Sequence, residues 1–491
     1  MNRHVLSKIN AVATLAALTF LGCVRHQVRH EPFAPELSEA RRAKSTPVSQ
    51  EKRLPDEVIP PKADGNVTRT VLPNGTRVFT IPIATNPVVA ALVLYDVGSR
   101  FETPETNGAA HFVEHMVFRG TENRPEPGAI SRELDALGAQ NNAYTSQEYT
   151  GFWIRVEASR FVQAYDVLYD MVARPLLRQS DTDIERGAIL QEEKRKRDDE
   201  TSFSWTILNG LMYGDDPLGR PVLGTSQTIS ALNRDDLLTF RQANYLPSRT
   251  VVAIAGAFDE RATLKMVKDT FGSLPPSSEP RPSFAAPRLQ EGPLIALDVR
   301  QEMNQALFTI AFPTYGCGDD RQYATEVLAN ALGGGMSSRL FTEVRDKRGL
   351  AYSVGAMNSC DSDTGEIIIR AGVELSKAEE ALSVIIGELK KLKNEPMSPD
   401  ELERSVSNLG GSFALGMEAS IDIASYYATQ EILTGAPVSP ALTLALYSDV
   451  SAPSVQDIAR DIFRARGLHL VVTSRRQDTA PFLNIARELG E

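Results

Sequence analysis

Apolar residues recur at helical spacing in one short stretch of the first quarter of the chain. Within residues 108–121, Phe112, Val113, Met116 and Val117 fall on one side of a helix, which predicts a helix with one buried face. Further helices are predicted over residues 159–176, over residues 227–244, and over residues 181–194, where Asp181 or Asp183 can cap the helix start.

Extended segments alternate with these helices. Residues 71–79 contain Asn74-Gly75 between two extended runs, which indicates a β-hairpin. Further strands are predicted over residues 87–97, 139–146, 149–154 and 250–257, with the second and third of these paired. The chain is therefore expected to have an α+β fold.

The second half of the chain repeats the pattern of the first. The segment Asp-Ile-Glu-Arg at 183–186 has a counterpart in Glu-Leu-Glu-Arg at 401–404. A helix followed by a strand over residues 236–254 recurs over residues 457–472. The offset stays near about 220 residues, which predicts two copies of one α+β unit.

Length and a proline-rich segment divide the chain into four parts. More than 400 residues follow a short leader and a linker, and this exceeds one ordinary domain. Residues 274–282, Leu-Pro-Pro-Ser-Ser-Glu-Pro-Arg-Pro, mark a boundary. We predict a leader over 1–23, a flexible tether over 24–66, a first domain over 67–283 and a second over 284–491.

The leader has the pattern of a bacterial lipoprotein signal. Arg3 and Lys8 give it a positive start, and residues 9–21 are apolar but too short to span a bilayer comfortably. Gly22-Cys23 follows, which indicates lipidation of Cys23 and contact with a membrane through the lipid. Simple secretion or an uncleaved anchor is the alternative.

The residues after Cys23 add to this prediction. Val24, rather than Asp, resembles sorting to the outer membrane, so we expect a lipoprotein on the periplasmic side of that membrane. Residues 24–66 contain Pro, Ser and charged residues with few large apolar ones, which is typical of a flexible tether.

Charge and cysteine content narrow the classes of function. The net charge is −11 and no basic stripe occurs, so nucleic acid is not an expected partner. Of the three cysteines, Cys23 is assigned to lipid. Cys317 and Cys360 either pair in an oxidising compartment or stay separate as small apolar groups, and the sequence leaves both possibilities open.

Histidine usage changes the interpretation of the helix within residues 108–121. The chain has six histidines, three of them in the leader and tether, and two of the others are His111 and His115. One helical turn separates these two, so they can bind one metal ion, for which zinc is the usual choice. Glu114 can take a proton from a water molecule at that metal. The alternative is a buried helix whose two histidines only satisfy hydrogen bonds.

A third ligand is expected on the helix over residues 181–194. Glu185 and Glu192 are seven residues apart and share a helical face, whereas Glu193 points about 100° away. We predict Glu192 as the ligand and Glu185 as a carboxylate that orients one of the histidines. An ordinary solvated, charged helix is the alternative. In the second copy, Gly410 stands where Glu192 would map and no histidine pair occurs, so that copy is expected to be metal-free.

The order His-x-x-Glu-His at 111–115 is followed by Glu192, with 76 residues between His115 and Glu192. This pattern resembles the pitrilysin/insulinase family of zinc metallopeptidases, including its bacterial processing-peptidase-like members. The resemblance covers nearly all of residues 67–480. It implies two homologous domains, each a mostly antiparallel sheet packed with helices, that form half of a clamshell. It also implies one Zn²⁺ per chain on His111, His115 and Glu192.

The resemblance implies further site residues. Asn142 and Ala143 match a sheet edge that receives the substrate as an added strand, although a plain hairpin is the simpler interpretation. Arg345 and Tyr352 match a pair in which the arginine holds the substrate backbone and the tyrosine donates to the developing oxyanion. A surface arginine and a core tyrosine are the alternative. A glycine-rich turn is included among the substrate-binding residues: Gly333, Gly334 and Gly335.

The sequence therefore predicts a zinc endopeptidase or oligopeptidase that hydrolyses unfolded peptides. The family encloses peptides between two halves, and this chain supplies one, so a homodimer or a heterodimer with a paralogue is implied. Two alternatives stay open. One is a non-catalytic paralogue that binds peptides or scaffolds a complex, and the other is a catalytic half that needs a different partner subunit.

Overall fold

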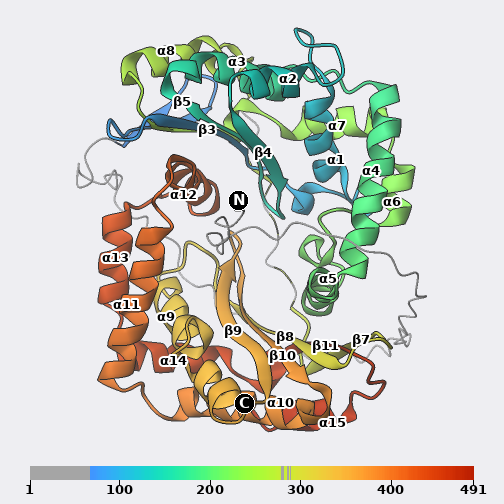
Figure 1. Ribbon diagram of the computed structural model, residues 1–491, viewed down its shortest axis with the longest axis vertical. Coiled ribbons are helices and arrows are strands. Elements are labelled where there is room, and N and C mark those ends of the chain that lie inside the picture. The colour runs from blue at the N-terminus through green and yellow to red at the C-terminus, as the bar shows by residue number, and fades with distance from the viewer. Residues whose placement is uncertain (1–66, 278–280, 283, 285–286, 288, 491) are drawn as a thin grey trace, which may run out of the picture. The chain divides into compact units, whose positions relative to one another are not determined.

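A computed structural model of the chain describes residues 67–277, 281, 282, 284, 287 and 289–490 (Figure 1). The predicted lipoprotein leader, its Cys23 and the predicted tether lie outside the described residues. Within the described part of the chain, no helix is both long enough and apolar enough to cross a membrane.

The first half is built on a six-stranded sheet. Its strands are β1 (Thr68–Val71), β2 (Arg77–Pro82), β3 (Val88–Tyr95), β4 (Gln140–Thr145), β5 (Thr150–Glu157) and β6 (Thr250–Gly256). Their spatial order is β1-β2-β6-β3-β5-β4, and every neighbouring pair is antiparallel except β2 with β6. The predicted hairpin around Asn74-Gly75 joins β1 to β2, and the predicted pairing of residues 139–146 with 149–154 is that of β4 with β5.

Helices cover one face of this sheet, as their apolar spacing requires. The helices of the first half are α1 (Ala109–Met116), α2 (Ala129–Ala136), α3 (Phe161–Ala173), α4 (Gln179–Asp198), α5 (Glu200–Tyr213), α6 (Ser226–Ala231), α7 (Arg234–Asn244) and α8 (Glu260–Asp269), of which α5 packs elsewhere. Buried side chains of α1, α3 and α7 pack with those of β3 and β5 into one apolar core. Burial of this core is the main term that stabilises the first half.

Two local predictions are wrong. Residues 227–244 form two helices rather than one, because the side chain of Asn233 accepts hydrogen bonds from the N–H groups of Asp235 and Asp236 and starts α7 anew. Neither Asp181 nor Asp183 caps α4, since that helix begins at Gln179 and has no side-chain cap.

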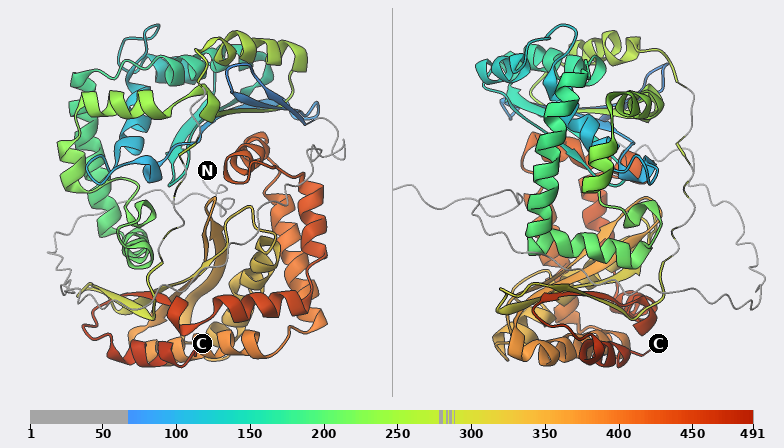
Figure 2. Two further views of the ribbon diagram at one scale, coloured as in Figure 1. Left: turned by 180° about the vertical axis from the view of Figure 1, so that it is seen from behind. Right: turned by 90° about the vertical axis from the view of Figure 1, so that its right-hand side faces the viewer.

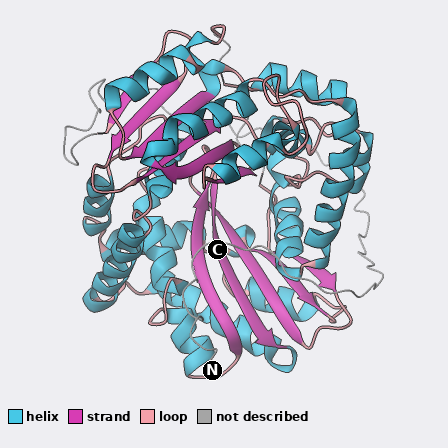
Figure 3. Cartoon of the chain, turned by 45° about the horizontal axis from the view of Figure 1, so that its top comes forward, coloured by secondary structure: helices cyan, strands magenta, loops and turns pink. Residues whose placement is uncertain are grey.

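The second half repeats the first in space. Its strands are β7 (Leu294–Val299), β8 (Gln305–Thr314), β9 (Ala351–Cys360), β10 (Gly365–Glu374) and β11 (His469–Ser474), in the order β7-β11-β8-β10-β9. Only β7 and β11 are parallel, so the pairings match those of β2-β6-β3-β5-β4. The internal repeat and the α+β fold class are confirmed (Figure 3).

Each half also lends a helix to the sheet of the other. The helices of the second half are α9 (Gln322–Gly333), α10 (Ala378–Asn394), α11 (Pro399–Leu415), α12 (Ser420–Leu433), α13 (Pro440–Ser448), α14 (Ala452–Ile462) and α15 (Ala480–Arg487). Ala424 and Tyr427 of α12 pack against β2, β3 and β6 on the face that α1 leaves free. In return, Leu208 and Met212 of α5 pack against β8, β10 and β11 (Figures 1 and 2).

A buried ionic contact joins the halves close to the start of α1. Arg100, only 2% exposed, donates to Glu148 at 2.6 Å and, through both Nη atoms, to Asp363 at 2.7 Å. Asp363 lies in the turn between β9 and β10, and a disulfide joins Cys317 to Cys360 beside that turn. The two cysteines therefore pair, which answers the question that the sequence left open.

Candidate metal centre

The helix that carries the histidines is held at its start by a side chain from outside the helix. Gly108 precedes α1 with a φ of 99°, in the left-handed region that favours glycine, and it offers no side chain to cap the helix. The side chain of Glu102 accepts hydrogen bonds from the N–H groups of Gly108 and Ala110, both at 2.8 Å. Burial raises the pKa of Glu102 to about 8, although the hydrogen bonds from Ala110 and Gly108 oppose this rise. Glu102 therefore replaces the missing N-cap of α1.

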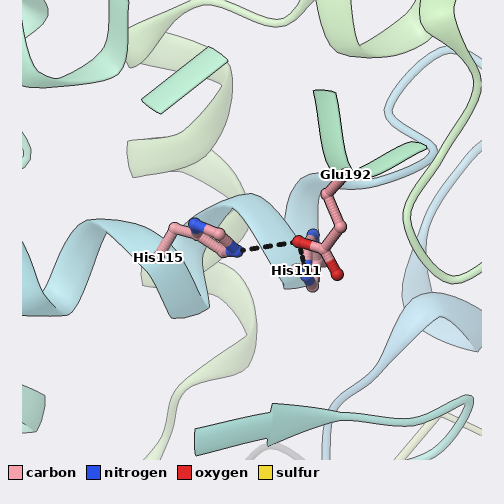
Figure 4. A group of neighbouring side chains, drawn as sticks. All are labelled: His111, His115 and Glu192. Carbon is pink, nitrogen blue, oxygen red and sulfur yellow. Dashed lines mark ion pairs between the residues drawn. The ribbon is translucent and has the colours of Figure 1, made fainter. Parts of the chain in front are cut away.

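Three side chains from α1 and α4 meet as the sequence predicts (Figure 4). One Glu192 oxygen, Oε2, lies 3.7 Å from His111 Nε2 and 3.6 Å from His115 Nε2. Both separations are too long for a good hydrogen bond. They match the ~3.4 Å expected between two ligands that each lie about 2.0–2.2 Å from one tetrahedral zinc ion. The candidate ligand atoms all lie within 4.8 Å of one another.

The charge states of two of these groups suit a metal. Burial lowers the pKa of His111, which is 7% exposed, to about 3, so its imidazole is neutral. The contact with His115 lowers the pKa of Glu192 to about 2, so its carboxylate is charged. Metal ligands need these protonation states.

The hydrogen bonding of His111 argues against the alternative of two merely satisfied histidines. Its Nδ1 is buried and has no hydrogen-bond partner among the described residues. Its Nε2 lies 3.7 Å from the Glu192 oxygen. A metal ion would take the lone pair of Nε2, for which the described residues offer no hydrogen-bond donor.

The two neighbouring glutamates of α4 have the positions that helix geometry predicts. Glu185 Oε2 lies 3.0 Å from His115 Nδ1, which directs His115 Nε2 toward Glu192. Burial alone would lower the pKa of His115, but its contacts with Glu185 and Glu192 raise it to about 9. Glu193 faces elsewhere, since Ser226 donates to it at 2.9 Å and Arg197 pairs with it.

Glu114 is tied to the edge of the first sheet. Its Oε2 accepts a hydrogen bond of 2.6 Å from the hydroxyl of Thr145, the last residue of β4. Burial raises the pKa of Glu114, and this hydrogen bond opposes the rise. Thr145 ends the strand on which Asn142 and Ala143 lie, and its contact with Glu114 was not predicted from the sequence. Among the described residues, β4 pairs only with β5, so its outer edge is available to a further strand.

Arg345 and Tyr352 lie together but in a separate group. The Arg345 guanidinium is 5.9 Å from the centre of the Tyr352 ring and 4.7 Å from that of Phe341. Tyr352 is 79% exposed at the start of β9, so the alternative of a core tyrosine is wrong. Within the described ranges, no hydrogen bond or ion pair connects either residue with the three candidate ligands. Their catalytic role stays a prediction.

The glycine-rich turn has a packing role in this structure. Gly333 ends α9, and a Cβ there would lie 2.1 Å from the backbone nitrogen of Ala356 in β9. A glycine is therefore needed for the close approach of α9 to β9. A role of Gly333, Gly334 and Gly335 in substrate binding stays a prediction.

Comparison with known protein families shows what this chain is related to. The family model described as "Insulinase (Peptidase family M16)" matches residues 77–226, and the model described as "Peptidase M16 inactive domain" matches residues 231–409. The first match contains His111, Glu114, His115 and Glu192, and the second contains none of them.

Individual proteins agree with these matches. An uncharacterized zinc protease of Streptomyces coelicolor is 36% identical over 82% of this chain and 88% of its own length. A protease from Helicobacter pylori has the same fold, with a TM-score of 0.76 and 22% identity over 83% of this chain and 99% of that one. A chain of complex III2 from Candida albicans has a TM-score of 0.75 and 16% identity over 87% of this chain and 100% of that one. The chain belongs to the insulinase family of peptidases, family M16.

Proposed function

We propose that the protein is a zinc-dependent endopeptidase or oligopeptidase that hydrolyses unfolded peptides. One observation carries the proposal: His111, His115 and Glu192 converge at separations suited to one shared ion, with the Glu114 carboxylate on the same helix. The names of its relatives, zinc proteases, agree with this activity.

The residues present fit a zinc ion. His111, His115 and Glu192 would hold it, and three protein ligands leave a fourth position for water or substrate, as in catalytic zinc sites. The ion would supply Lewis-acid polarisation of the water and of the peptide carbonyl.

Glu114 performs the proton transfers in this proposal. Its carboxylate accepts a proton from the attacking water and then delivers it to the nitrogen of the leaving amine. The hydroxyl of Thr145 holds one carboxylate oxygen, Oε2, and leaves Oε1 to take the proton. Burial raises the pKa of Glu114 and so makes it a stronger base than an exposed glutamate.

The available edge of β4 supports an extended peptide as the substrate. A peptide added as a strand beside Asn142 and Ala143 would be bound through main-chain hydrogen bonds, which do not depend on its sequence. The same strand ends at Thr145, which contacts Glu114, so the added peptide would be led toward the proposed zinc ion. A folded protein cannot offer such a free strand, and we therefore expect unfolded peptides as substrates.

The direct test is cleavage of a library of unstructured peptides by the purified protein. We expect about one zinc ion per chain, loss of cleavage after the metal is removed with a chelator, and recovery when zinc is returned. A protein that keeps its zinc and binds peptides without cleaving them would instead favour a peptide-binding or scaffold role.

The position of Tyr352 suggests that a second subunit completes the site. We propose a dimer in which Arg345 and Tyr352 of one chain face the zinc of its partner. The alternatives are use of both residues by their own chain and a partner that is a paralogue. The complex III chain from Candida albicans that shares the fold belongs to a larger assembly, which is compatible with either kind of partner.

Mixing two defective variants tests this arrangement. The Glu114→Gln and Tyr352→Phe proteins should each have weak peptidase activity alone. After mixing, random pairing makes half of the dimers hetero-dimers, and each hetero-dimer has one intact site. The mixture should therefore recover roughly a quarter of the sites. The measurement is peptide cleavage before and after mixing, with exchange checked by pull-down of tagged chains. Exchange without recovery would contradict a site shared between two copies.

For localisation we propose a lipoprotein on the periplasmic side of the outer membrane. The disulfide between Cys317 and Cys360 supports an oxidising compartment. We expect Cys23→Ser to move the protein from the membrane fraction to the soluble fraction, because lipidation needs the thiol. Fractionation of wild type and variant measures this, and a wild type that is already soluble would contradict it.

A further inference from the structure

Arg119 extends the chain of contacts that begins at His115. It ends the short helical turn Val117–Arg119 that follows α1, four residues after His115 and hence on the same helical side. Its Nη1 lies 3.3 Å from Glu185 Oε1, while the other oxygen of that carboxylate, Oε2, lies 3.0 Å from His115 Nδ1. The two oxygens of Glu185 thus serve one partner each.

We propose that Arg119 is a positioning residue, which holds Glu185 in the orientation that directs His115 toward the metal. This inference rests on the metal site of the proposed function. When His115 donates through Nδ1 to Glu185, its Nε2 keeps the lone pair that a metal needs. The carboxylate can do this reliably only if its own rotation is restricted, and Arg119 supplies that restriction.

Arg119 also lies near a second carboxylate, although the separation is too long for a hydrogen bond. Its Nε lies 3.8 Å from Asp181 Oδ1, and Asp181 also pairs with Arg178, whose Nη1 lies 3.3 Å from Oδ2. Asp181 and Glu185 are one turn apart on α4, so the guanidinium spans two acidic residues on one face of that helix. A planar fork with several donors suits such a position better than the single ammonium group of lysine.

Charge balance gives Arg119 a second effect on the site. The carboxylates of Glu185, Glu192 and Glu114 all lie around the two histidines. The positive charge of Arg119 lies beside Glu185 and offsets the charge of that carboxylate. Removal of Arg119 should loosen the hold on His115 without removing any ligand.

The simpler interpretation is that Arg119 only ties the end of α1 to α4 and has no effect on the metal. Zinc affinity, measured by competition with a chromogenic chelator, distinguishes this structural role from the proposed positioning role. We expect Arg119→Met to weaken zinc binding about 10-fold, at the lower end of the range for residues that support metal ligands. Arg119→Lys should restore part of the affinity.

Arg178→Met is the matched control, because Arg178 pairs with the same Asp181 and has no ion pair with Glu185 among the described residues. It should leave zinc affinity within about twofold of wild type, since it touches no group that holds His115. Thermal unfolding of the metal-free proteins checks that the two variants are equally folded. Equal loss of zinc affinity in both would overturn the proposal.

A double-mutant cycle shows whether Arg119 acts through Glu185. In a Glu185→Gln background, Arg119→Met should cause little further loss of zinc affinity, because its target is already gone. The same about 10-fold loss in both backgrounds would overturn the proposal. The absorption spectrum of the cobalt-substituted protein, which reports on ligand geometry, should change in Arg119→Met and not in Arg178→Met.

These measurements use no peptide, so they are independent of turnover. A wild type that binds zinc and cleaves no peptide would overturn the proposed activity and leave the role of Arg119 standing. A wild type that binds no zinc would overturn both.

Discussion

Glu114→Gln should keep its zinc and lose about 10²- to 10⁴-fold in the rate of peptide cleavage, the range that general acid–base catalysis contributes. Glutamine has the shape of glutamate but cannot accept and return the proton of the attacking water. The change leaves His111, His115 and Glu192 untouched, so the metal site itself persists. The amide oxygen can still accept the hydrogen bond from Thr145, which keeps the side chain in place.

Zinc content and the steady-state rate on one unstructured peptide measure this result. Thr145→Val is a useful companion, because it removes only the hydroxyl that orients Glu114 and should slow cleavage by much less. A Glu114→Gln protein that cleaves peptides at close to the wild-type rate would show that another group is the base. Loss of zinc from this variant would show that Glu114 takes part in holding the metal.

The parts of the site that the sequence predicted are those fixed by helix geometry. His111 and His115 must share a face of α1, and Glu185 and Glu192 must share a face of α4, whatever the rest of the fold does. The same geometry separates Glu192 from Glu193. What geometry alone could not supply was the meeting of the two helices, which came from the family resemblance.

The parts that the sequence did not reveal depend on contacts between distant residues. Glu102 caps α1 from outside the helix, so it lies at no position that a capping rule inspects. The contact of Thr145 with Glu114 and that of Arg119 with Glu185 are tertiary, and residue spacing does not reveal either contact. Only the fold brings these groups together.

The same reasoning explains the errors in the fold. The start of α4 was placed at an aspartate because aspartate is a strong capping residue, but the helix begins at Gln179 and Asp181 pairs with Arg178. The exchange of α5 and α12 between the two sheets was not predicted either, because the apolar residues of a helix do not indicate which sheet they will cover. Their destination depends on which sheet face is left uncovered.

Comparison of the two copies shows what the metal site requires beyond the fold. Both sheets have the same pairings, and both present an edge strand, β4 in the first and β9 in the second. The second copy has Gly410 in α11 where the first has Glu192 in α4, and the neighbour that a Cβ at Gly410 would meet is Leu444, at 3.3 Å. Glycine has no side chain that could bind a metal ion, so a shared fold has not preserved the site.

Glu192→Gln and Glu193→Gln should differ sharply in metal content. The first change replaces the anionic member of the three candidate ligands. A four-ligand zinc site has a binding free energy of ~10–16 kcal/mol, so an even division assigns roughly 3 kcal/mol to each ligand. Loss of one ligand should therefore lower zinc affinity about 10²-fold or more. Glu193→Gln makes the same chemical change one residue further along α4, where the side chain contacts Ser226 and Arg197 instead.

Glu193→Gln is therefore the matched control for the loss of one carboxylate charge from this helix. Its exposed ion pair with Arg197 contributes at most about 1 kcal/mol, so the variant should fold normally and keep wild-type zinc affinity. Metal analysis after dialysis against a weak chelator measures both proteins, and cleavage activity should follow their zinc content. Equal loss of zinc from the two variants would mean that the charge of the helix, rather than ligation, governs zinc binding. Loss of zinc from Glu193→Gln alone would mean that the wrong glutamate has been assigned to the metal.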